Sequence, residues 1–409
     1  MSVCQDTYND FARELYDVAT RNDARTSYIP GANAIISPIS VQTSLMLAFV
    51  GAAGRTENEL RTGLKLGPGD RQEIAKSYHD FWTQLCNYGN KMTLKSVNRL
   101  FVNHKLQLQH EFKELAEDYF HSQPMPLNFA DATKATQQIN AFVEQATENK
   151  IRDLLQPDAV NAETSAILIN ALYFKGLFQK PFMPESTMPD DFYLEQNKRV
   201  TVDMMYQEDK FKYAELPELS ARAVALPYVD SDISLLILLP NKICGLQELE
   251  RRLPNLSLVS LDQHMRTEDV EIALPKFSIE YDLDLKDTLQ QLGISELFGD
   301  AANLSRLFED AAGQKISEAK HRGYIDVNEA GSEAAAVTFL KVVPMSLNMH
   351  KKTFKVDHPF MFFIRNSRAV FFAGRFVSPK KKEFIMSSRE PKSSDSMRMQ
   401  VEDMSVNES

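Results

Sequence analysis

Cysteine is scarce in this chain of 409 residues, which contains only Cys4, Cys86 and Cys244, all far apart. An odd and dispersed set is not a disulfide framework, and the lack of a CxxC pair argues against a structural zinc site. The eight histidines are also scattered, and none has the spacing of a metal ligand. We therefore expect neither a metal nor another cofactor.

Excess positive charge is missing too, because 46 Lys and Arg residues stand against 56 Asp and Glu residues, a formal net charge of −10. Such a chain is not expected to bind nucleic acid or an anionic membrane. The longest apolar stretches, 233–239 and 360–364, are far too short to cross a bilayer. The polar N-terminus lacks the apolar region of a signal peptide, which predicts a cytoplasmic protein. Non-classical export, or a signal sequence missing from this chain, would instead make it extracellular.

The common catalytic signatures are the third absence. The patterns GxSxG, HExxH, GxGxxG and GxxxxGK[ST] do not occur, so the chain is not expected to be an enzyme. His321 lies in a predicted strand, where a core histidine with a satisfied hydrogen bond is preferred over a ligand or a base. Asp282 and Asp284 lie at a predicted strand-to-helix junction, where helix capping is preferred over acid–base catalysis.

The composition that is present, 43% hydrophobic and 25% charged, supports a large core. Helical patterns occupy 6–22, 38–51, 71–86, 108–120, 131–147, 245–252 and 284–292. Strand patterns occupy 164–174, 198–206, 211–215, 222–229, 232–239, 268–282, 316–328, 354–356, 360–365 and 369–376. Helices followed by strands, without βαβ alternation, predict one α+β domain over 1–379. The polar, Ser-rich stretch 380–409 is predicted to be a disordered tail.

The segment 316–346 is the most informative part of the chain, because a strand is followed by a run of small residues. If the run is a strand, its uncharged face carries Ser332, Ala334, Ala336, Thr338, Leu340 and Val342. The other face carries Gly331, Glu333, Ala335, Val337, Phe339 and Lys341. A surface loop or a helix fits the same composition. A segment compatible with both a loop and an inserted strand is suited to a conformational switch.

Several motifs, in order along the chain, resemble the serpin family. They are Asn33 with Ser37-Pro38-Ile39-Ser40, Asn170-Ala171-Leu172-Tyr173-Phe174-Lys175-Gly176, Val202, Met204-Met205, Leu274-Pro275-Lys276-Phe277, the stretch 354–364, and Phe372-Ala373-Gly374-Arg375-Phe376. The similarity covers nearly all of 6–379. It implies a serpin fold of about nine helices on three β-sheets, with an exposed reactive-centre loop at about 329–350.

The resemblance also implies roles for individual residues. The loop hinge would be Glu329, Ala330, Gly331, Ser332, Glu333, Ala334, Ala335, Ala336, Val337 and Thr338. The 17 residues from Glu329 through Met345 match the usual hinge-to-scissile-bond length, which points to Met345–Ser346 as the reactive bond, with Leu347 as the alternative reactive residue. The cluster at the sheet opening would contain Ser37, Ser40, Asn170, His321 and Phe178. Phe178 stands where the family usually has Trp.

Two functions remain open from the sequence. An inhibitory serpin would be a suicide substrate that forms a covalent acyl complex with a serine protease, and the small residues of the hinge favour this reading. The apolar Met345 would suit elastase-like, chymotrypsin-like or subtilisin-like enzymes. The alternative is a non-inhibitory serpin that acts as a carrier or chaperone. The helix at 71–86 has only two basic residues, Arg71 and Lys76, so no glycosaminoglycan site is evident, and a monomer is expected.

Overall fold

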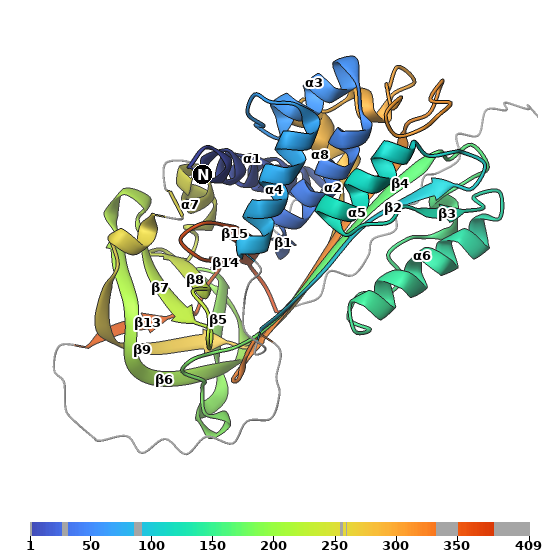
Figure 1. Cartoon of the computed structure of the whole chain (residues 1–409). Coiled ribbons are helices and arrows are strands. Elements are labelled where there is room, and N and C mark those ends of the chain that lie inside the picture. Colours follow the sequence, from blue (N-terminus) through green and yellow to red (C-terminus); the bar gives the residue numbers. More distant parts are fainter. Residues whose placement is uncertain are drawn as a thin grey trace, which may run out of the picture.

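The computed structural model describes residues 2–26, 32–85, 92–253, 257–258, 260–332 and 351–379. The α-helices in these ranges are α1 Ser2–Thr26, α2 Pro38–Gly51, α3 Gly54–Gly63, α4 Arg71–Leu85, α5 His110–Phe120, α6 Ala132–Ala146, α7 Leu246–Arg252 and α8 Leu285–Gln291. The β-strands are β1 Ala34–Ile36, β2 Met92–Asn103, β3 Met125–Leu127, β4 Ala166–Leu177, β5 Thr187–Glu195, β6 Lys198–Leu216, β7 Ala221–Pro227, β8 Ser234–Pro240, β9 Arg266–Pro275, β10 Phe277–Asp284, β11 Ile316–Asn328, β12 Gly331–Ser332, β13 Lys352–Lys355, β14 Phe360–Arg365 and β15 Val370–Phe376. This arrangement confirms the α+β class (Figure 1).

Helix α2 begins where the sequence predicts, because Ser37 and Pro38 form an N-terminal cap. The Ser37 side chain accepts a hydrogen bond from the backbone N–H of Ser40 at 3.3 Å, and Pro38 occupies the start of the helix. Every residue of α2 is buried, and the helix contacts β2, β4 and β15. It therefore runs through the interior of the fold.

None of the described helices combines the length and apolarity that a bilayer crossing requires.

A six-stranded sheet has the strand order β10-β11-β12-β4-β2-β3. β4 lies inside this sheet, and its residues 166–174 are all buried, in agreement with the predicted central strand. It pairs in parallel with β11, from Ala166 opposite Ile316 to Tyr173 opposite Tyr324. We call this junction, 166–173 of β4 against 316–324 of β11, the seam. Beyond the end of the seam, the two-residue strand β12 lies between β4 and β11.

A nine-stranded sheet contains the other strands in the order β1-β15-β14-β8-β7-β6-β9-β13, with β5 paired to β6. β6 corrects the prediction of two strands at 198–206 and 211–215, because its polar residues 207–210 stay in register with β9 across the expected break. The predicted strand 268–282 is instead two strands, β9 and β10, which belong to different sheets. The chain passes from one sheet to the other at Lys276, the residue between them.

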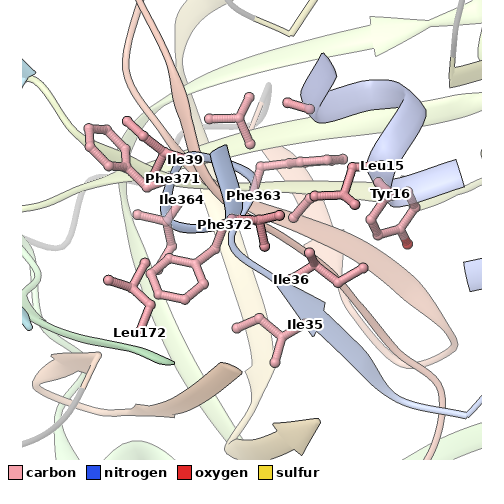
Figure 2. Close-up of a cluster of buried hydrophobic side chains, with 14 of the residues drawn as sticks. Leu15, Tyr16, Ile35, Ile36, Ile39, Leu172, Phe363, Ile364, Phe371 and Phe372 are labelled. Atoms are coloured by element: carbon pink, nitrogen blue, oxygen red, sulfur yellow. The ribbon is translucent and has the colours of Figure 1, made fainter. Parts of the chain in front are cut away.

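Two apolar clusters lie on opposite faces of the six-stranded sheet, because alternate residues of β4 point to opposite sides. Figure 2 shows the centre of the larger cluster, where side chains of α1, β1, α2, β4, β14 and β15 meet. In the smaller cluster, Ile139 and Val143 of α6 pack with Phe101 of β2 and with Ile167 and Ile169 of β4. Figure 1 shows α6 on the other side of β2 and β4 from α2 and α4. Helix α6 therefore covers one face of the sheet.

Candidate functional site

The first part of the predicted hinge enters the six-stranded sheet as β12. Ser332 lies opposite Val327 of β11 on one side and Gly176 of β4 on the other. Gly331 has a φ of +144°, and a Cβ atom on it would clash with the carbonyl oxygen of Gly176. Both the backbone angle and the close approach require glycine at this position. The start of the hinge is thus built into the sheet at the point where β4 and β11 separate.

The side chain of Ser332 ends in an aromatic cage. Ser332 is 0% exposed, and its hydroxyl lies 2.6 Å from the hydroxyl of Tyr228. The Tyr228 ring stacks on Phe178 at 5.3 Å and meets the edge of Phe174 at 5.0 Å. Burial raises the pKa of Tyr228, so this hydroxyl stays protonated. The cage leaves room for a small side chain at position 332, because Tyr228 already occupies the adjoining space.

Glu329 anchors the turn that precedes β12. Its carboxylate accepts a hydrogen bond from the Thr187 hydroxyl at 2.9 Å and pairs with the Lys276 ammonium at 3.0 Å. Burial acts to raise the pKa of Glu329, but hydrogen bonds from its own backbone N–H, Lys276 and Thr187 outweigh this, and the pKa lies below its usual value. The backbone N–H groups of Phe182 and Phe178 donate to the carbonyls of Glu329 and Ala330 at 2.9 and 2.8 Å.

A buried polar cluster crosses the seam at its middle. Asn170 of β4 and His321 of β11 lie side by side in register, and Nδ1 of His321 hydrogen-bonds to Oδ1 of Asn170. The backbone N–H of Ser37 donates to Nε2 of His321 at 3.2 Å. Since Nε2 accepts, the ring proton is on Nδ1. The amide of Asn170 also donates to the hydroxyl of Ser40 at 2.6 Å, so four of the five predicted cluster residues meet here.

The sequence reasoning missed the part of this cluster that β2 supplies. Asn98 lies opposite Asn170 in the sheet, and its Oδ1 accepts hydrogen bonds from Asn170, from Ser40 at 3.2 Å and from Ser44 at 2.9 Å. Its amide donates to the Ser96 hydroxyl at 2.8 Å. The available signal was weak: Ser96 and Asn98 are two polar residues at strand spacing on the same face, but Lys95 and Arg99 flank them, so the stretch has no apolar run that marks a buried strand. The strand 92–103 itself was not predicted.

Phe178 is a correction to the predicted cluster. It belongs to the aromatic cage around Ser332, near the end of β4, eight positions along the chain from Asn170. The predicted single cluster is therefore two sites, a polar one inside the seam and an aromatic one where the seam ends. His321 is fully buried, and burial lowers its pKa from 6.5 to about 3, so the ring is neutral at physiological pH.

The remaining predicted site residues lie outside the described residues. They are the hinge residues Glu333, Ala334, Ala335, Ala336, Val337 and Thr338, the predicted reactive bond Met345–Ser346, and the alternative Leu347. On α4, Arg71 pairs with Glu111 and donates to the carbonyl of Val50 at 3.0 Å. Among the described residues, no group of three or more His, Cys, Asp or Glu side chains is arranged to hold a metal.

Comparison with known proteins gives a consistent result. A family model described as "Serpin (serine protease inhibitor)" matches residues 6–379. Serine protease inhibitor 42Dd of Drosophila melanogaster is 34% identical, covering 90% of this chain and 95% of its own. The leukocyte elastase inhibitor of Bos taurus is 34% identical, covering 87% of this chain and 95% of its own. The crystal structure of Serpin48 from Tenebrio molitor superimposes with a TM-score of 0.83 at 33% identity, covering 92% of this chain and 98% of its own.

Proposed function

Because the chain belongs to the serpin family of protease inhibitors, we propose that it inhibits serine proteases as a suicide substrate. The protease serine hydroxyl attacks the carbonyl carbon of Met345 and passes its proton to the protease histidine. That proton then goes to the amine of Ser346 as the peptide bond breaks, which leaves the protease esterified to Met345. The freed loop inserts as a strand between β4 and β11, and carries the protease with it before water can cleave the ester.

The observation that carries this proposal is the position of β12. Gly331 and Ser332 already pair with β4 and β11 at the end of the seam, so insertion needs only to extend an existing strand. The Ser332 side chain points into the buried aromatic cage. By strand alternation, Ala334, Ala336 and Thr338 would follow it into the same core, and all three are small.

Insertion of a strand between β4 and β11 has an energetic cost, because the contacts of the seam must first break. The parallel ladder between β4 and β11 must separate, and so must the hydrogen bond between Asn170 and His321 that crosses it. A new central strand forms one ladder with β4 and another with β11, which more than replaces the single ladder lost. The net gain is available only after cleavage, when the loop is free at one end. The uncleaved protein would therefore keep its loop outside the sheet for kinetic reasons, although the inserted state has the lower free energy.

The target class follows from the residue that the loop presents. Met345 offers an unbranched apolar side chain, which suits elastase-like, chymotrypsin-like or subtilisin-like pockets and offers no cation to a trypsin-like one. The similarity to the bovine leukocyte elastase inhibitor supports the first of these classes. Cleavage after Leu347 would instead favour chymotrypsin-like enzymes. In either case the chain itself acts as inhibitor and not as enzyme.

A panel of serine proteases tests the proposal. Incubation should give a complex that survives SDS, and mass spectrometry of the released C-terminal fragment should show a new N-terminus at Ser346. A start at Asn348 would place the reactive residue at Leu347. Clean cleavage by every protease, without a complex, would contradict the proposal and favour a non-inhibitory carrier or chaperone.

A matched pair of variants tests the insertion step. Ala334→Arg places a charge on the face that would be buried, and should convert the inhibitor into a substrate that is cut without complex formation. Ala335→Arg places the same charge on the opposite face, and should retain complex formation. Equal behaviour of the two variants would show that the loop does not insert in the proposed register.

A further inference from the structure

Two histidines that are far apart in the sequence meet on the surface of the fold. His79 belongs to α4, and His121 directly follows the last residue of α5. The centroids of their rings lie 5.5 Å apart, and the ring planes are inclined at 72°. His79 is half-buried and His121 is exposed, so solvent reaches both side chains. Their spacing along the chain gave no sign of a metal site, but the packing of α4 against α5 brings them together.

The backbone determines which nitrogen of His79 is available to a ligand. Nδ1 of His79 lies 3.0 Å from the carbonyl oxygen of Tyr119, which can only accept a hydrogen bond. In the neutral ring the proton is therefore on Nδ1, and Nε2 carries a lone pair. The contact of Nε2 with the exposed hydroxyl of Thr83 is long, at 3.4 Å. A ring that donates from one nitrogen to a backbone carbonyl and keeps the other accessible has the arrangement of a metal-binding histidine.

His121 is held by the end of α5. Its backbone N–H donates to the carbonyl of Glu117, and the N–H of Ser122 donates to the carbonyl of Ala116, each at 3.1 Å. Helices commonly end on a residue in the left-handed conformation, and that residue is usually glycine. His121 has a φ of +46°, a conformation that costs a residue with a Cβ more than it costs glycine. The chain therefore places an imidazole beside His79 at a position where glycine would relieve backbone strain.

The separation of the two rings fits a shared metal ion. Zinc binds imidazole nitrogen at about 2.0–2.1 Å, which places the centroid of each ring about 3.2 Å from the metal. At the tetrahedral angle that zinc adopts in proteins, two such centroids lie about 5.2 Å apart. The observed separation of 5.5 Å is close to this value, and the exposed His121 side chain can rotate to direct a nitrogen at the ion.

We propose that His79 and His121 form a binding site for a divalent transition metal ion, with water completing the coordination. Imidazole suits zinc, copper and nickel, and Cu²⁺ should bind more tightly than Ni²⁺ or Zn²⁺. Mg²⁺ and Ca²⁺ prefer oxygen ligands and should not bind. The site lies on α4 and α5, outside the seam, and the inference goes beyond the proposed inhibition of proteases.

A bound ion would connect α4 to a segment that holds β2. Ser122, the residue after His121, donates its hydroxyl to the carbonyl of Asn98 at 2.8 Å. Asn98 is the β2 residue of the polar cluster around Asn170. The ion would therefore join α4 to β2 through residues 121–122. Since this geometry exists only in the folded chain, metal binding should stabilise the folded state as the metal concentration rises above the dissociation constant.

Calorimetric titration of the whole protein with ZnCl₂, in a buffer that does not bind zinc, tests the site directly. The wild type should bind about one equivalent. His79→Gln and His121→Asn should each weaken this binding at least about tenfold, because one of the two protein ligands is lost. Asparagine suits the left-handed conformation at position 121, so His121→Asn keeps the end of α5. The double variant should bind no more than about twofold more weakly than either single variant, because the two ligands act together.

His110→Gln is the matched control for these variants. His110 is also a histidine of α5, its side chain is 86% exposed, and it lies 3.4 Å from Glu114 on the same helix. Its replacement should change zinc affinity by no more than about twofold. A wild type that does not bind zinc would overturn the proposal. Equal losses in all three single variants would overturn it too, because they would show binding to scattered surface histidines. Losses that multiply in the double variant would show two independent sites and would also refute it.

Hydrogen exchange locates the ion independently of affinity. Zn²⁺ should slow exchange of the backbone amides of residues 121 and 122, whose hydrogen bonds close the end of α5, in the wild type but not in His121→Asn. Slowing that persists in His121→Asn, or that leaves these two amides unchanged, would place the ion elsewhere and refute the site. Zinc binding without any covalent protease complex would refute only the proposed function, and a complex without zinc binding would refute only this inference.

Discussion

Acidification is expected to open the seam by protonating His321. The neutral ring donates from Nδ1 to Asn170 and accepts at Nε2 from the backbone N–H of Ser37. A proton on Nε2 would place two donors face to face, and neither hydrogen-bond partner of the ring is a carboxylate. Protonation therefore breaks the bond to Ser37 and puts a charge on a side chain that is fully buried.

The sign and size of the effect follow from the two pKa values. Burial lowers the pKa of His321 from 6.5 in water to about 3 in the closed sheet. Between these values the opened chain binds the proton more tightly, so the closed state has its full stability above about pH 6.5 and loses stability as the pH falls. At about pH 5 the loss is ~2 kcal/mol, or about thirtyfold in the rate of opening when the ring is hydrated in the transition state.

The assay measures the rate at which the intact protein takes up a labelled synthetic peptide of residues 332–343, at about pH 7.5 and at about pH 5. His321→Gln is the control, because glutamine retains one donor and one acceptor but does not titrate. Peptide uptake by the wild type should become up to about thirtyfold faster on acidification, and uptake by the variant should change far less. Equal acceleration in both proteins would show that other groups control opening, and would refute the assignment of the pH response to His321.

Three further results are expected. Gly331→Ala should expel β12 from the sheet, because a Cβ clashes with the Gly176 carbonyl. In a protein that carries Ser332→Cys as a reporter, adding Gly331→Ala should make the new thiol react with a thiol reagent faster than in the Ser332→Cys protein alone. An unreactive thiol would contradict this prediction. A double-mutant cycle of Glu329→Gln and Lys276→Gln, measured by urea unfolding rates, should give a coupling energy of about 0.5–1 kcal/mol, because the Lys276 side chain is 38% exposed and solvent screens the pair. A coupling energy of zero would show that this ion pair does not anchor the turn before β12. Mild peroxide should slow inhibition by the wild type by about tenfold to a couple of hundredfold, because the sulfoxide of Met345 fits an apolar pocket less well, and should leave Met345→Leu unaffected; equal losses in both would move the sensitive residue elsewhere.

Local patterns predicted the elements well where the signal was contained in neighbouring residues. The start of α2 follows from Ser37 and Pro38, whose cap involves residues three positions apart. The buried centre of β4 follows from its continuous apolar run. The prediction failed at the polar stretch 207–210, which separates the two expected strands 198–206 and 211–215, because pairing with β9 keeps this stretch extended. Which strands pair is decided by distant residues that the local pattern does not contain.

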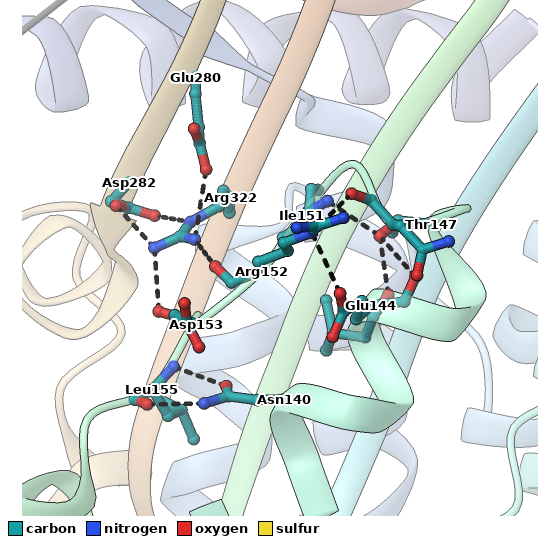
Figure 3. A network of polar contacts seen from close by, with 12 residues as sticks. Asn140, Glu144, Thr147, Ile151, Arg152, Asp153, Leu155, Glu280, Asp282 and Arg322 are labelled. Carbon is teal, nitrogen blue, oxygen red and sulfur yellow. Dashed lines mark hydrogen bonds and ion pairs between the residues drawn. The ribbon is translucent and has the colours of Figure 1, made fainter. Parts of the chain in front are cut away.

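The candidate site divides in the same way. The sequence by itself determined that the hinge carries glycine and small residues with one uncharged face, because side-chain size and alternation are properties of consecutive residues. Only the tertiary structure decided that Ser332 meets Tyr228, that Asn98 completes the polar cluster around Asn170, and that Arg322 of β11 binds the carbonyl of Arg152 (Figure 3). These partners lie 72 to 170 positions apart in the chain. Hydrogen bonds and burial depend on distances in space, and for residues so far apart those distances exist only once the sheets and α6 have packed together.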